Sequence, residues 1–306
     1  MDNIARLLVI ISTLRDPEHG CAWDLKQTFA SIAPHTIEEA YEVVDAIERG
    51  DLAGFMDELG DLLLQVVYYA QIAKERNMFD FDQIAKTIGD KLVRRHPHVF
   101  GDVKFADDQA RARAYDAEKA LERAAKQGTG VVGALHDVAL NLPALTRARK
   151  LQKRAARVGF DWPDEAGVLA KIEEELAEVY QALIAQGGDE DQASLLPSLP
   201  KSPLRSRLSK QGVAQRFRDR SAATNADDRH SPVGEEIGDL LFAVVNLARW
   251  RDVDPEGALR AANQKFERRF RAVEAKLAKQ RRCPEDCTLE ELDALWDEVK
   301  HEDLES

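Results

Sequence analysis

Acidic residues recur at helical spacing in two parts of this sequence, and their chemistry is that of a site for divalent cations. Glu58 and Asp61 are three positions apart, so they share one face of a helix, and the apolar residues that follow indicate an interior helix. Burying an isolated charge costs several kcal/mol, so such carboxylates must be solvated, paired or metal-bound. The pattern therefore predicts a carboxylate cluster that binds a hard divalent cation.

The segment upstream supplies a second pair of carboxylates. Glu39 and Glu42 lie on one side of a predicted helix, opposite its apolar side. If the two helices pack antiparallel, four acidic groups converge, and a divalent cation is what makes such a cluster stable. A solvated helix face is the usual explanation for an E-x-x-E pair alone. The E-x-x-D pair on an interior helix favours the cluster instead.

The same blocks occur twice in the same order, which predicts two tandem copies of one domain rather than a solenoid. The second copy offers Glu175, Glu178, Glu236 and Asp239 as metal ligands, with Glu174 beside them. The matched segments are 38–42 with 174–178, 57–63 with 235–241, and 91–95 with 265–269.

The third matched block is basic. Lys265, Arg268 and Arg269 share one helix surface, and Lys91 and Arg95 repeat the pattern in the first copy. Such a trio alone is most often a solvated face. On a helix that follows an acidic metal cluster, it is a candidate clamp for phosphate oxygens.

An aromatic residue and a lysine stand one helical turn apart near the end of the chain. Trp296 could offer a plane for a nucleobase and Lys300 a cation. The alternative, a core tryptophan with a snorkelling lysine, fits the sequence equally well. Two further pairs are assigned no chemistry. His96 and His98 flank a proline in a predicted turn, and the cysteines at 283 and 287 lack the other ligands of a zinc site.

Composition limits the class of protein. The 306 residues are 44% apolar and 32% charged, which excludes disordered and membrane-embedded classes. The net charge of −12 argues against general nucleic-acid affinity. The longest apolar stretch, 62–73, is too short to span a bilayer, and the first residues do not predict a signal peptide. Three cysteines without a disulfide pattern predict a reducing cytoplasm.

Apolar residues recur at three- and four-residue intervals nearly throughout, so we predict an all-α fold. We expect an N-terminal domain at 1–104, a helical connector at 105–142 and a C-terminal domain at 143–306. The second copy contains extra residues at about 187–231. These are basic and rich in proline, serine and arginine, and their composition predicts a mobile surface loop.

The segments 21–24, 27–28, 36–42 and 57–63 strongly resemble the MazG family of nucleoside triphosphate pyrophosphohydrolases, and the resemblance extends over both halves. It implies two tandem MazG-like helical bundles, Mg²⁺ dependence, a homodimer, and cleavage of nucleoside triphosphates to monophosphate and pyrophosphate. It associates activity with the C-terminal copy, although the insertion before Glu236 departs from the family pattern.

The resemblance also implies roles for individual residues. The metal ligands would be Glu175, Glu178, Glu236 and Asp239, and one glutamate, Glu175 or Glu174, would accept a proton from water. Lys171, Lys265 and Arg269 would contact phosphates, and Trp296 the nucleoside. The N-terminal copy keeps the corresponding residues Glu39, Glu42, Glu58, Asp61, Lys91 and Arg95.

Two other classes of function compete with this one. A ferritin-like di-metal oxidase is also helical and rich in carboxylates, but it needs an E-x-x-H pair on two helices, which this sequence lacks at these positions. A helical interaction scaffold would use the basic insertion to recruit an acidic partner, with binding that weakens as salt increases.

Overall fold

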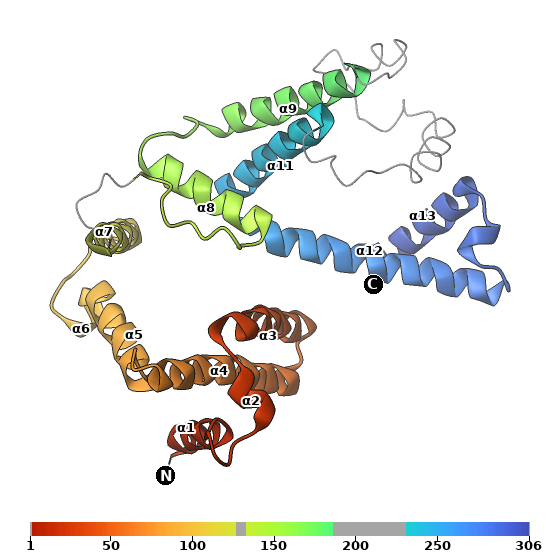
Figure 1. The fold of residues 1–306 in the computed structure, drawn as a ribbon. Helices are drawn as coiled ribbons and strands as arrows, with labels where there is room; N and C mark the ends of the chain where they lie inside the picture. The colour runs from red at the N-terminus through yellow and green to blue at the C-terminus, as the bar shows by residue number, and fades with distance from the viewer. Residues whose placement is uncertain (1, 127–132, 186–230, 306) are drawn as a thin grey trace. The chain divides into compact units, whose positions relative to one another are not determined.

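The computed structural model of the protein describes residues 2–126, 133–185 and 231–305, and every regular element in these ranges is helical (Figure 1). The prediction of an all-α fold is therefore confirmed. The chain divides into two units, Met1–Gly130 and Val131–Ser306. The predicted insertion falls almost wholly on residues 186–230, outside the described ranges. No helix of the described residues is both long enough and apolar enough to cross a lipid bilayer.

Unit 1 is built on two long helices that pack along each other, α3 and α4 (Figure 1). Thr28 caps α3 in a reciprocal capping box with Ser31, and Gly50 ends it in the left-handed conformation, with φ 68°, that glycine adopts at least cost. Asp51 then caps α4. The helices are α1 (Asn3–Leu14), α2 (Ala22–Lys26), α3 (Phe29–Arg49), α4 (Leu52–Glu75), α5 (Phe81–Arg95), α6 (Pro97–Phe100) and α7 (Asp108–Lys126).

The apolar core of unit 1 lies where α1 and α3 meet α4. Its buried side chains are Ile11, Ile32, Val67, Tyr68 and Ile72. Val67, Tyr68 and Ile72 lie on one side of α4, Ile11 comes from α1 and Ile32 from α3. The core therefore joins the three helices.

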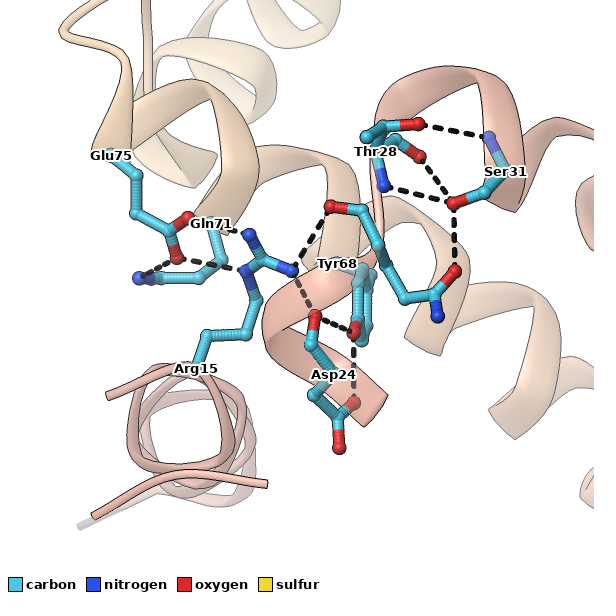
Figure 2. Close-up of polar contacts among 8 residues, drawn as sticks. Arg15, Asp24, Thr28, Ser31, Tyr68, Gln71 and Glu75 are labelled. Carbon is cyan, nitrogen blue, oxygen red and sulfur yellow. Dashed lines mark hydrogen bonds and ion pairs between the residues drawn. The ribbon is translucent and has the colours of Figure 1, made fainter. Parts of the chain in front are cut away.

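A buried polar network fixes α2 against α1 and α4 (Figure 2). Arg15, which ends α1, pairs in bidentate fashion with Glu75, at 2.9 Å from Nε and 2.7 Å from Nη2. Its remaining amino group donates to the backbone carbonyl of Asp24. The hydroxyl of Tyr68 lies 2.8 Å from a carboxylate oxygen of Asp24, and burial raises the pKa of this tyrosine to about 12. The network ties three helices together with charge-assisted hydrogen bonds.

Unit 2 repeats the paired helices with α9 and α11, and α8 packs against α11. Ser231 caps α11, whose first residue is a proline, a good N1 residue because its missing N–H is not needed there. A separate small core joins α12 to α13 through Val273, Leu277 and Val299. The elements are α8 (Ala144–Arg157), α9 (Glu165–Ala185), α11 (Pro232–Trp250), α12 (Pro255–Lys279), the 3₁₀ turn η3 (Pro284–Asp286) and α13 (Leu289–Glu305).

Candidate metal centres and phosphate-binding residues

The structure brings carboxylates of α3 and α4 together in unit 1. Glu39, Glu58 and Asp61 each offer an oxygen, and these three oxygens lie within 4.8 Å of one another. Glu42 lies beside this group. Burial raises the pKa of Glu39, and the neighbouring charges of Asp61 and Glu42 raise it further. All four predicted ligands therefore share one region, and three of them form a tight group that we call cluster 1.

An equivalent group forms in unit 2 between α9 and α11. Glu175, Glu236 and Asp239 offer oxygens within 4.8 Å of one another, and we call these residues cluster 2. Glu178 again lies beside the group, one helical turn after Glu175. Desolvation and then the charge of Glu175 raise the pKa of Glu178. Asp239 is exposed and Glu236 is half-buried, so the cluster is open to solvent on one side.

Glu175 is the buried member of cluster 2, with only 5% of its surface exposed. One carboxylate oxygen, Oε1, accepts from the ammonium of Lys171 at 2.7 Å. The other, Oε2, is buried without a hydrogen-bond partner among the described residues. A buried carboxylate oxygen without a donor is costly, so this atom is a natural ligand for a cation.

Lys171 links Glu175 to Glu174, the other predicted proton acceptor. Its ammonium lies 2.8 Å from the exposed carboxylate of Glu174, and the two hydrogen bonds raise the pKa of Lys171. The lysine is therefore fully protonated at neutral pH. It stands one helical turn before Glu175 on α9.

The donor sets of both clusters fit a hard divalent cation. Every member is a carboxylate, and oxygen ligands are those that Mg²⁺ and Mn²⁺ prefer. The clusters contain no histidine, so the E-x-x-H ligand set of a di-iron oxidase is not formed there. The orphaned oxygen of Glu175 is the observation that supports the fit most directly.

The arginines of the two basic blocks pair with carboxylates on the next long helix, and in unit 1 Arg94 also pairs with Glu118 at 2.9 Å. Arg268 and Arg269 converge on one oxygen of Asp303, at 2.9 and 2.7 Å. In unit 1, Arg94 and Arg95 converge on Glu122 of α7 in the same way. Lys265 is exposed, and Lys91 is half-buried. The structure thus holds two of the predicted phosphate ligands, Arg95 and Arg269, in place through a carboxylate.

Trp296 packs as a core residue while keeping part of its ring accessible. It lies against the small core of α12 and α13, and its ring centre is 5.2 Å from that of Phe266. Lys300, one turn further along α13, is half-buried. The packing alternative raised by the sequence is present, and the half-buried ring is still able to contact a ligand.

Sequence reasoning missed Gln65, whose buried amide donates to Oε1 of Glu39 at 3.3 Å. A polar residue inside the apolar stretch of α4 was the available signal. It also missed the carboxylates that hold the arginines, Glu122 and Asp303, because nothing in the sequence shows which acidic residue of a charged helix faces its neighbour.

The residues set aside in the sequence lie apart from cluster 1 and cluster 2. His96 and His98 contact each other, with ring centres 5.8 Å apart, and further aromatic rings. The thiol of Cys283 donates to Asp286, and this hydrogen bond raises its pKa to about 11. Both cysteines of this pair are free thiols. Within the described ranges, cluster 1 and cluster 2 are the groups of ligand atoms suited to a metal.

A helical chain with a carboxylate cluster between paired helices in each of two units is an all-α protein with two candidate oxygen-ligand metal sites. Residues 27–100 match the MazG nucleotide pyrophosphohydrolase domain. The chain is 44% identical to the nucleoside triphosphate pyrophosphohydrolase of Escherichia coli K12, over the whole of both chains. The chain therefore belongs to the MazG family, which confirms the family predicted from the sequence.

Two more relatives match almost the whole of this chain. The nucleoside triphosphate pyrophosphohydrolase/pyrophosphatase MazG of Thermotoga maritima is 38% identical, over 96% of this chain and 94% of its own. The uncharacterized protein YabN of Bacillus subtilis is 37% identical over 97% of this chain but only 51% of its own length.

Proposed function

We propose that this protein hydrolyses nucleoside triphosphates to the monophosphate and pyrophosphate in a Mg²⁺-dependent reaction, and that it clears unwanted nucleotides from the cell. The observation that carries this proposal is cluster 2 with its buried, half-satisfied Glu175. Membership of the MazG family and the full-length similarity to two named nucleoside triphosphate pyrophosphohydrolases support the reaction class.

The residues that would hold the cation in unit 2 are Glu175, Glu178, Glu236 and Asp239. When bound, Mg²⁺ (or Mn²⁺) polarises phosphate oxygens and lowers the pKa of a coordinated water. When substrate binds, Lys171 turns from its two glutamates to the phosphates, where its positive charge offsets the negative charge of the phosphate chain. Glu174 or Glu175, now without its lysine, accepts the proton of the attacking water.

The basic residues of α12 contribute to the leaving group. Lys265, with Arg268 and Arg269, offsets the negative charge that develops on pyrophosphate. Asp303 restricts both guanidinium groups, so less side-chain freedom is lost when phosphate binds. Trp296 and Lys300 contact the nucleoside. In the first copy, Lys91 and Arg95 take the phosphate role.

We further propose a cytoplasmic homodimer. The exposed apolar residues on α3 support self-association: Ile37, Tyr41 and Ile47 are each 44% exposed or more. The three free cysteines support a reducing compartment.

Product analysis tests the reaction. With Mg²⁺ and several nucleoside triphosphates, the protein should yield equal amounts of monophosphate and pyrophosphate. Orthophosphate with diphosphate would contradict the proposal. Glu175→Gln and Asp239→Asn should each abolish turnover with unchanged helicity by circular dichroism, and full activity of either variant at ordinary Mg²⁺ concentrations would refute the site.

A further inference from the structure

The repeat between the two units extends further than the three blocks visible as matched segments. Helix α7 has an aromatic residue, a lysine and an acid at positions 115, 119 and 122, and α13 has the same classes at 296, 300 and 303. The spacing of four and then three residues is identical. All three positions lie on one face of a helix, because residues three and four apart are neighbours there.

The contacts of the two helices also correspond. Glu122 of α7 receives Arg94 and Arg95, and Asp303 of α13 receives the matching Arg268 and Arg269. In each unit, the acidic residue of this pattern (Glu122 or Asp303) thus pairs with the two adjacent arginines of the matched basic block. Correspondence in sequence spacing and in contacts together identifies α7 as the first copy's counterpart of α13.

The side chains at the aromatic position of α7 form a group suited to a nucleotide. Tyr115 is half-buried, and its ring centre lies 5.9 Å from that of His96. The guanidinium of Arg95 lies 5.5 Å from the same ring centre and the ammonium of Lys119 5.1 Å. A nucleobase stacks on an aromatic ring whatever its identity, and the neighbouring cations attract phosphates. Tyr115 has the place in the sequence pattern of α7 that Trp296 has in the pattern of α13.

We propose that unit 1 contains a second nucleoside triphosphate site, in which Tyr115 stacks on the base and Lys119 and Arg95 contact the nucleotide's anionic part. This rests on the proposed function, since it takes the substrate class from unit 2. It assigns α7, the helix expected from the sequence to be a connector, to nucleotide binding. Each chain therefore binds two nucleotides.

The test counts bound nucleotides on the full-length protein by calorimetric titration. The probe is a nucleoside triphosphate with a methylene bridge between the α and β phosphates, in the presence of Mg²⁺, so that no cleavage occurs. The wild type should bind two per chain. Tyr115→Leu, which keeps bulk without a ring, should bind one, or bind the second about tenfold to 100-fold more weakly.

Two controls separate stacking from damage to the helix. Tyr115→Phe keeps the ring and should retain two bound nucleotides. Leu121→Ala changes an exposed residue of the same helix and should do the same. Circular dichroism should show equal helicity for all variants.

The outcomes are distinct. One nucleotide per wild-type chain, bound equally well by Tyr115→Leu, overturns this proposal and leaves the proposed function intact. No binding at all overturns both. A single nucleotide that is lost in Tyr115→Leu supports the site in unit 1 and contradicts the assignment of unit 2.

Discussion

Cluster 1 and cluster 2 have the same acids at the same helical positions, yet their central glutamates are held by different partners. Glu39 is half-buried and accepts from the neutral amide of Gln65, which belongs to the opposite helix. Glu175 is buried and accepts from the ammonium of Lys171 on its own helix. The position of Lys171 is occupied by His35 in the first copy, where the imidazole lies 3.4 Å from Glu38.

This difference bears on how each site receives a cation and an anion. In cluster 2 the ammonium of Lys171 already lies against Oε1 of Glu175, so a cation bound at the free Oε2 is repelled by that charge. A lysine that moves away from Glu175 is then available to phosphate. In cluster 1 Glu39 accepts from the neutral amide of Gln65, so a cation that binds Glu39 competes with no positive charge there. One acidic pattern thus supports two kinds of site.

Neutralising the ligands of each cluster should have the largest effect. Replacing Glu175 by Gln together with Asp239 by Asn should lower turnover more than about 100-fold. Loss of a residue that only hydrogen-bonds to a metal ligand costs up to about that much, and these two residues are proposed as ligands themselves. The matched pair is Glu39→Gln with Asp61→Asn. Pyrophosphate release from a nucleoside triphosphate measures both, and a greater loss from the unit 1 pair would reverse our assignment of the main active site.

The buried network of unit 1 should contribute more to stability than the ion pair between Arg249 and Asp161 in unit 2, whose arginine is more exposed than Arg15 (14% against 6%). Arg15→Met leaves Glu75 without its cationic partner and with the amide of Gln71 as its remaining hydrogen-bond donor among the described residues, and because Glu75 is one-third exposed we expect a loss of about 3 kcal/mol, the lower end for buried pairs. Arg249→Met, which removes the ion pair with Asp161, should cost about 1–2 kcal/mol. Urea unfolding of the two variants provides the comparison, and equal losses would contradict it.

Lys171→Met should act in two opposite directions. It removes a charged phosphate contact, which should lower kcat/KM roughly ten- to 100-fold. It also removes the competitor for Glu175, so the Mg²⁺ concentration that gives half-maximal rate should decrease. Steady-state kinetics over a range of Mg²⁺ concentrations measures both, with His35→Ala as the control in the other copy. An increased Mg²⁺ requirement would show that the lysine does not compete.

The smallest effect concerns the carboxylates that hold the arginines. The guanidinium of Arg95, joined by Arg94, lowers the pKa of Glu122 to about 2 from the usual 4.5. A lowered carboxyl pKa contributes stability above the unfolded value, and this is lost as pH falls from about 4.5 toward 2. The difference in Tm between wild type and Glu122→Gln should therefore be largest near pH 7 and decrease below pH 4.5. A difference that stays constant down to pH 3 would contradict the ion pair.

Much of the fold could be predicted because it depends on local periodicity. The three- and four-residue recurrence of apolar side chains predicts helices wherever it occurs, and Glu58 and Asp61 must share a helical face whatever surrounds them. The duplicated blocks predicted two copies. The family was recognisable from the same motifs, and the comparisons confirm it.

Other features of the sites could not be predicted, since they depend on which residues of different helices meet. Nothing in the sequence distinguishes Glu122 from the other acids of α7 as the partner of Arg95, or selects Gln65 to contact Glu39. The separation of Glu42 and Glu178 from the tight three-residue groups is also a matter of helix packing.

The sequence by itself determined the helices, the faces on which the carboxylates lie and the duplication of the pattern, because each follows from spacing along one chain. Only the tertiary structure decided which carboxylate is buried, which lysine or amide holds it and which acid restrains the arginines. Those properties depend on distances between helices, and such distances are set by how the cores of each unit pack.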